Sequence, residues 1–143
     1  MTKAAYMRSI AEAVKLKSTC PQDAVGAVFS TQDHEVLATG YNGAPRGMPH
    51  CPKDCHGECQ HAVHAEANAI VQAAKRGHAL EGSVLWITRW PCRRCAMLIA
   101  NLRVHSVVSW GKLNAEGILI LDLARVDHYN LNEWGALGPL PLR

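Results

Sequence analysis

Apolar side chains follow two different periods along this chain, and the change between them outlines the predicted elements. Between residues 4 and 17 they recur at helical spacing, and Pro21 lies a short distance beyond, where a helix cannot continue. The short apolar runs 24–29 and 35–39 flank a polar stretch, which predicts a β-hairpin. Residues 40–60 contain four glycines and three prolines, a composition typical of a loop.

The rest of the chain alternates between helical and strand patterns. A helix is predicted over residues 64–76, because Gly77 follows it as a helix-ending residue. Residues 83–88 predict a strand buried on both faces, after which Pro91 opens a third helix. The apolar face predicted for that helix consists of Cys95, Leu98, Ile99 and Leu102. The remaining predicted elements are a strand over 104–110, a helix over 115–124, a strand over 125–131 and a loop over 135–143.

A hairpin followed by strands that alternate with helices predicts a single α/β domain over residues 1–143. Helices are expected on both faces of its central sheet. With 48% hydrophobic and 19% charged residues, the composition is that of an ordinary globular protein. No apolar run approaches the roughly 18 residues of a membrane helix. The start of the chain also lacks the layout of a secretory signal. We therefore expect no membrane partner and a cytoplasmic location, in the host if the protein is viral.

The charge balance favours a small anionic ligand over a polynucleotide. Fifteen basic and twelve acidic residues give a net charge of +3, and the basic residues are scattered. A nucleic-acid-binding surface usually carries a dense basic stripe. We therefore expect a small phosphorylated substrate and no nucleic-acid partner.

The cysteines and histidines are concentrated in one segment. Four of the eight histidines and three of the six cysteines lie within residues 50–64. In a chain without an export signal, such cysteines are more typical of thiolate ligands than of disulfides. This density predicts bound metal.

Two short motifs carry the predicted chemistry: His64-Ala65-Glu66 and Pro91-Cys92-Arg93-Arg94-Cys95. Cys92 and Cys95 are three apart at the start of a helix, so both sulfurs point to one side. His64 opens another helix. If the two helix N-termini meet, these three side chains form three corners of a tetrahedral zinc site and leave the fourth to water. The partial positive charge of a helix N-terminus lowers the pKa of thiols there.

Glu66 is the predicted catalytic residue. It lies two residues from His64 and is not needed as a ligand, so it can move protons between water, ring nitrogen and leaving ammonia. The pattern H-x-E followed by P-C-x-x-C is the signature of zinc nucleobase deaminases. A non-catalytic zinc module is the alternative from another class, and it leaves Glu66 without a role. In such deaminases the residues that enter this turn border the mouth of the active site, which makes Trp90, directly before Pro91, a candidate for contact with the substrate.

Longer strings around these motifs resemble the deoxycytidylate (dCMP) deaminase family, in its microbial and phage-type form. The strings are Ser18-Thr-Cys-Pro21, Val25-Gly-Ala27, Gly40-Tyr-Asn-Gly-Ala-Pro45, His64-Ala-Glu-Ala-Asn-Ala-Ile70 and Pro91-Cys-Arg-Arg-Cys95. The resemblance implies a cytidine-deaminase-like three-layer α/β/α sandwich on a mixed, about five-stranded sheet. It also implies a homo-oligomer, with a hexamer favoured, and hydrolysis of dCMP to dUMP and ammonia, which supplies dUMP for thymidylate synthesis.

The same resemblance implies further binding residues. Asn42 and Gly43 are expected to contact the sugar or phosphate of the nucleotide, and Arg46 and Lys53 to meet phosphates. Many members are regulated by dCTP and dTTP, bound with Mg²⁺ near this loop. A second, structural Zn²⁺ is implied on Cys20, Cys51, Cys55 and Cys59, and His50, His56 or His61 could replace one of these ligands.

Other activities of the same superfamily stay open at this point. A nucleoside or free-base deaminase would share the zinc motif. A tRNA adenosine deaminase would also share it, with a stronger basic surface for the RNA backbone. Ammonia release from dCMP, with the other substrates in parallel, separates these activities.

Overall fold

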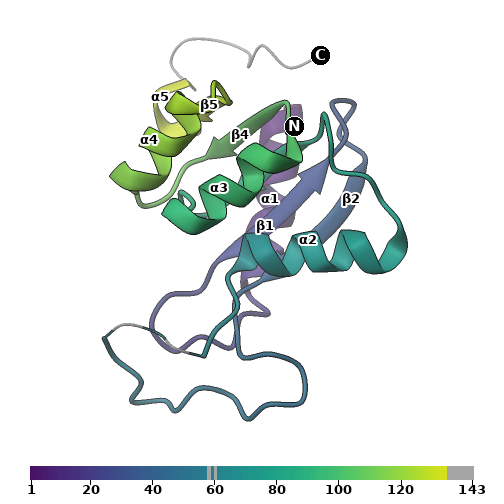
Figure 1. Cartoon of the computed structure of the whole chain (residues 1–143). Coiled ribbons are helices and arrows are strands. Elements are labelled where there is room, and N and C mark those ends of the chain that lie inside the picture. Colours follow the sequence, from purple (N-terminus) through teal and green to yellow (C-terminus); the bar gives the residue numbers. More distant parts are fainter. Residues whose placement is uncertain (58, 60, 135–143) are drawn as a thin grey trace.

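A computed structural model describes residues 1–57, 59 and 61–134 of the chain (Figure 1). The predicted loop over 135–143 lies outside the described residues. Every predicted helix and strand is present with shifted ends, and the short helix α5 is an addition. In chain order the elements are α1 (Lys3–Lys15), β1 (Gly26–Ser30), β2 (Val36–Tyr41), α2 (Ala65–Arg76), β3 (Val84–Ile87), α3 (Arg93–Leu102), β4 (Ser106–Ser109), α4 (Ala115–Leu123), β5 (Asp127–Asn130) and α5 (Leu131–Trp134).

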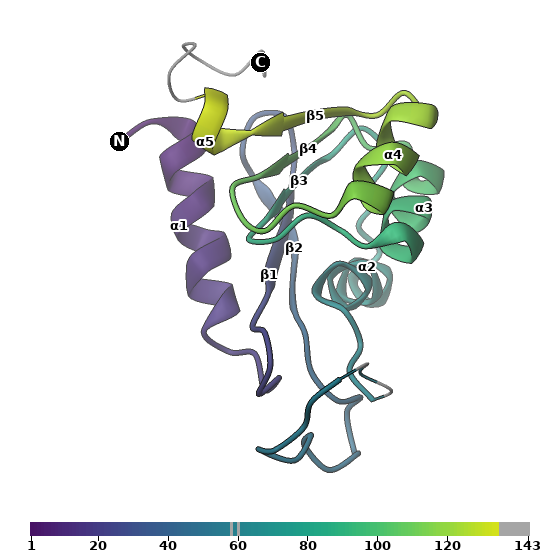
Figure 2. The same ribbon diagram turned by 90° about the vertical axis from the view of Figure 1, so that its left-hand side faces the viewer.

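The five strands form one mixed sheet in the order β2-β1-β3-β4-β5. Strand β1 pairs antiparallel with both β2 and β3, whereas β3, β4 and β5 are parallel to one another. Helix α1 covers one face of the sheet, and α2, α3 and α4 cover the other (Figure 2). This arrangement confirms the predicted three-layer α/β/α sandwich.

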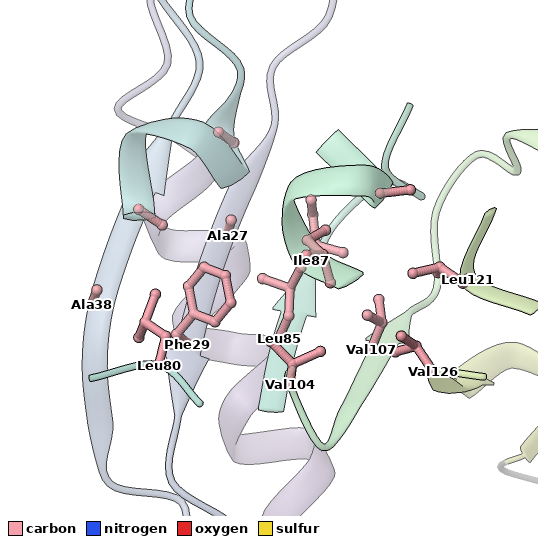
Figure 3. Packing of buried hydrophobic residues seen from close by; sticks show 14 of the residues in the cluster. Ala27, Phe29, Ala38, Leu80, Leu85, Ile87, Val104, Val107, Leu121 and Val126 are labelled. Carbon is pink, nitrogen blue, oxygen red and sulfur yellow. The ribbon is translucent and has the colours of Figure 1, made fainter. Parts of the chain in front are cut away.

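Hydrophobic side chains fill the space on both sides of the sheet. Because successive side chains of a strand point to opposite faces, neighbours along β1 and β3 enter different layers. Phe29 and Leu85, paired across these strands, pack beneath the helices α2 to α4 (Figure 3). Val28 and Trp86 pack on the side of α1, with Met7. Strands β1, β3 and β4 are buried along their whole length. For β3, the apolar sequence predicted this burial.

Helix α3 differs from its prediction at two points. It begins at Arg93 with Cys92 as its N-cap, so Pro91 precedes the helix instead of opening it. Its buried side chains are Cys95, Ala96 and Ile99, whereas Leu98 is 48% exposed. Leu98 has the right spacing for the apolar stripe, but it faces away from the sheet.

Two glycines bring the helices close to the chain segments of the site. A Cβ at Gly40 would collide with the backbone of Ala65 and Ala69, so glycine allows β2 to touch the start of α2. A Cβ at Gly117 would collide with the carbonyl of Pro91, next to Cys92. No described helix is long and apolar enough to cross a membrane.

Candidate metal centre and active site

The predicted motifs place two side chains at the N-terminal ends of helices. His64 is the N-cap of α2, and Cys92 is the N-cap of α3. An N-cap side chain usually accepts a hydrogen bond from a backbone N–H of its own helix. Neither His64 nor Cys92 makes this bond, so both side chains are available to other partners.

His64, Cys92 and Cys95 come together as predicted. The Nδ1 atom of His64 lies 3.5 Å from the Sγ atom of Cys92 and 3.5 Å from the Sγ atom of Cys95. All three potential ligand atoms lie within 4.8 Å of one another. Zinc bonds of about 2.3 Å to sulfur and 2.0–2.1 Å to nitrogen, at a tetrahedral angle, separate such atoms by roughly 3.5 Å. The donor set and its spacing therefore fit a zinc ion.

The three side chains also perturb one another's pKa values. Hydrogen bonds from Cys95 and then from His64 lower the pKa of the Cys92 thiol to about 3. The hydrogen bond with Cys92, followed by burial, raises the pKa of Cys95. The hydrogen bond with Cys92 also raises the pKa of His64, and burial and the charge of Arg89 oppose this rise. These directions favour the thiolate form at Cys92, and a bound cation would displace the proton of Cys95.

Glu66 lies in the first turn of α2 and is only 4% exposed. Burial raises the pKa of its carboxyl group, and a hydrogen bond with the Cys95 side chain places this group beside the cluster. A carboxyl group whose pKa is moved towards neutrality can both accept and donate a proton near physiological pH. Its position and burial suit a proton shuttle.

A pocket of about 320 Å³ opens against this cluster, and its lining includes His64, Glu66 and Cys92. This volume is within the range of small-molecule sites. Trp90 and Asn42, both predicted to contact the substrate, line the same pocket. Trp90 is 2% exposed, and its ring meets that of His128 edge-on at 5.5 Å. Gly43 and Arg46 are not among the lining residues.

Asn42 has a structural role that the sequence did not reveal. Its Oδ1 atom accepts hydrogen bonds from the backbone N–H of Val25 at 2.8 Å and from the hydroxyl group of Ser18 at 2.6 Å. Its Nδ2 atom donates to the carbonyl oxygen of Asp23 at 2.7 Å. The amide therefore fastens the segment between α1 and β1 to the end of β2. Gly43 acts through its backbone, which exchanges two hydrogen bonds with Val63 just before His64.

Arg89 and Asp23 are pocket residues that sequence reasoning missed. The guanidinium group of Arg89 forms an ion pair with the carboxylate of Asp23, although 66 positions separate the two residues. One sequence feature could have predicted Arg89 as a pocket residue: it lies directly before Trp90 and the Pro91-Cys92 motif.

Three of the four cysteines assigned to a second zinc act on the fourth, Cys51. Cys51 has a raised pKa, first because of burial and then because of the charges of Cys59, Cys55 and Cys20. All four are free and partly buried. Among the described residues, their sulfurs do not form a group as compact as that of His64 and its partners.

A glutamate buried beside a His-Cys-Cys cluster, on a five-stranded α/β/α sandwich, defines the class of zinc-dependent deaminase domains. A family model, the cytidine and deoxycytidylate deaminase zinc-binding region, matches residues 1–110. The chain belongs to this family.

Relatives and solved structures agree with this assignment. The deoxycytidylate deaminase of Mycobacterium phage D29 is 38% identical over 119 residues, which cover 72% of this chain and 90% of the relative. ComE operon protein 2 of Bacillus subtilis is 33% identical over 71% of this chain, and the match spans only 56% of that protein. The dCMP deaminase of cyanophage S-TIM5, solved with dCMP and dUMP, superposes with a TM-score of 0.81 and 32% identity, covering 90% of this chain and 95% of that one.

Proposed function

We propose that this chain is a zinc-dependent deaminase that hydrolyses dCMP to dUMP and ammonia. The observation that carries the proposal is the buried carboxyl group of Glu66, held against His64, Cys92 and Cys95 at the wall of the pocket. The names of the phage relatives and the nucleotides in the cyanophage structure support dCMP as the substrate. The product would supply dUMP for thymidylate synthesis.

His64, Cys92 and Cys95 would hold the catalytic zinc. When bound, a zinc ion in such a site polarises a water molecule and lowers its pKa towards about 7. Glu66 accepts a proton from water while the water oxygen bonds to the ring carbon that bears the amino group. Glu66 donates this proton to the ring nitrogen. It then takes the second proton from the new hydroxyl group on that carbon and donates it to the amino group, which leaves as ammonia when its carbon–nitrogen bond breaks and the carbonyl group forms.

Asn42 is the candidate for contact with the sugar. One of its two N–H groups already donates to the carbonyl oxygen of Asp23, so the other is the group that we assign to the substrate. Trp90 contributes an apolar wall to the pocket. Gly43 would support this contact indirectly, by fixing the backbone beside Asn42.

A second zinc on Cys20, Cys51, Cys55 and Cys59 belongs to the proposal as a structural ion. The interactions among these four thiols support it, and the ion would order a loop with little apolar content. Elemental analysis should give two zinc ions per chain. A value of one, with the catalytic ligands intact, would contradict this assignment.

We further propose that dCTP and dTTP, bound with Mg²⁺, regulate the enzyme. Arg46 and Lys53 are exposed on the loop after β2, where the phosphates of such an effector would be expected. A change in the dCMP saturation curve on addition of dCTP and Mg²⁺ tests this part. An unchanged curve would contradict it.

We also propose a homo-oligomer, with a hexamer favoured. Large apolar side chains are about half exposed or more on the helices α2, α3 and α4, which cover the same face of the sheet (Figure 2). They are Val71, Met97, Leu98, Leu119 and Leu123. Analytical ultracentrifugation measures the assembly directly, and a monomer would contradict the proposal. A single domain over residues 1–143 and a cytoplasmic location stay predictions.

The decisive experiment is a substrate panel. Ammonia release is measured with dCMP, deoxycytidine, cytidine, cytosine and tRNA at equal enzyme concentration. The proposal expects dCMP to have the highest kcat/KM by at least one power of ten. Equal values for dCMP and deoxycytidine would favour a nucleoside deaminase. No ammonia from any substrate, with zinc bound, would favour a non-catalytic zinc module.

A further inference from the structure

If the substrate is dCMP, some group of the protein must recognise its phosphate, and the metal end of the pocket is poorly suited to do so. Glu66 lines that end, and Asp23 adds a second carboxyl group to the pocket. These groups repel a phosphate dianion. Arg89 is the one Lys or Arg among the described residues that line the pocket.

The backbone on both sides of Arg89 is fixed by hydrogen bonds. The N–H of Thr88 donates to the carbonyl oxygen of Gly26 at 3.1 Å, and the Thr88 hydroxyl group accepts from the N–H of Gly26 at 3.1 Å. On the other side, the N–H of Trp90 donates to the carbonyl oxygen of Lys112 at 3.0 Å. Arg89 therefore projects from a rigid segment at the end of β3, which favours a defined direction for its side chain.

The present partner of Arg89 is easily exchanged. In the ion pair, the side chain of Arg89 is 36% exposed and that of Asp23 is 48% exposed. Ion pairs with this degree of exposure contribute little net stability. A guanidinium group binds phosphate through two parallel hydrogen bonds, and a phosphate dianion carries more charge than a carboxylate. A phosphate that enters the pocket can thus replace Asp23.

We propose that Arg89 recognises the 5′-phosphate of the substrate and that Asp23 is its counter-ion in the substrate-free protein. This inference rests on the proposed function and extends it, because it names the residue that selects the nucleotide over the nucleoside. Asn42 holds the backbone of Asp23 through the carbonyl oxygen, so the carboxylate can leave Arg89 by rotation of the Asp23 side chain alone.

Three variants test the proposal in steady-state assays with dCMP and deoxycytidine. Arg89→Gln removes the charge and should lower the kcat/KM ratio of dCMP to deoxycytidine about 10- to 100-fold, mainly through a higher KM for dCMP. Arg89→Lys keeps the charge and should recover part of the ratio. Asp23→Asn removes the competing carboxylate and should keep or raise the ratio. Arg76→Gln, exposed in the last turn of α2 and outside the pocket lining, is the matched control and should leave the ratio unchanged.

Product binding gives a readout that is independent of turnover. By calorimetry, dUMP should bind the parent protein more tightly than deoxyuridine, and Arg89→Gln should reduce this difference. If the ion pair is only a brace between β3 and the segment before β1, Arg89→Gln and Asp23→Asn will lower the melting temperature alike and affect both substrates equally. That result would overturn the inference. A parent protein without preference for dCMP would instead refute the proposed function itself.

Discussion

Replacement of Glu66 by Gln is the most direct test of the chemistry. The change keeps the size and hydrogen-bonding capacity of a side chain that is 4% exposed, but removes its ability to take up and release a proton. General acid–base catalysis contributes about 10²–10⁴ in rate, or roughly 3–5 kcal/mol of the barrier. We expect kcat for dCMP to fall by this factor. Initial rates of ammonia release at saturating dCMP measure it.

Two measurements separate lost chemistry from a damaged fold. Zinc content should be unchanged, because Glu66 is not one of the proposed metal ligands. The melting temperature should be unchanged or higher, because a neutral amide replaces a carboxylate whose burial raises its pKa. Glu116→Gln is the matched control, since Glu116 also lies in the first turn of a helix but is exposed. A Glu66→Gln protein with a kcat within about threefold of the parent would refute the assignment.

The remaining predictions concern the metal, the packing and the pH dependence of stability. Cys92→Ser should lose catalytic zinc and activity together, as metal analysis and rates will show; full activity without metal would exclude this ligand. Gly40→Ala should reduce the unfolding free energy by about 1–3 kcal/mol in urea titrations, because its Cβ meets the backbone of Ala65, and an unchanged midpoint would contradict this packing. Burial, and then the charge of Lys3, hold the pKa of His34 below 6.5. The unfolded chain therefore binds this proton first, so stability is lost as pH falls from 6.5 through the lower folded value. His34→Asn, which tolerates the φ of 72° at this position, should weaken that loss in unfolding titrations at several pH values, and an identical pH profile would argue against it.

The sequence predicted the elements well because most of their signals are local. Gly77 ends α2 in the left-handed conformation that its position predicted. The doubly apolar β3 lies in the middle of the sheet. Local patterns did not predict the order of the strands, since the pairing of β1 with β3 joins segments that are far apart in sequence. They also misplaced Leu98, because helical periodicity does not distinguish a side chain on the core from one on another exposed apolar face.

The residues of the site also divide into those that local motifs predict and those that depend on contacts between distant segments. His64, Glu66, Cys92 and Cys95 lie in two short motifs whose spacing fixes their directions on helices, so sequence reasoning could bring them together. The pairing of Arg89 with Asp23 depends on how the end of β3 meets the segment before β1, and no spacing rule encodes that contact. The three hydrogen bonds of the Asn42 side chain are equally non-local.

The charges of the pocket explain why the substrate needs both Arg89 and Glu66. The lining contains two carboxyl groups, those of Glu66 and Asp23, and among the described residues Arg89 is its one Lys or Arg. A phosphate placed against Glu66 would meet no guanidinium or ammonium group. With Arg89 as the cation of the lining, the phosphate is attracted there, and the base is left to meet Glu66. Arg89 would then set the orientation of the substrate as well as its affinity, so its loss should increase KM for dCMP while the proton transfer at Glu66 stays intact.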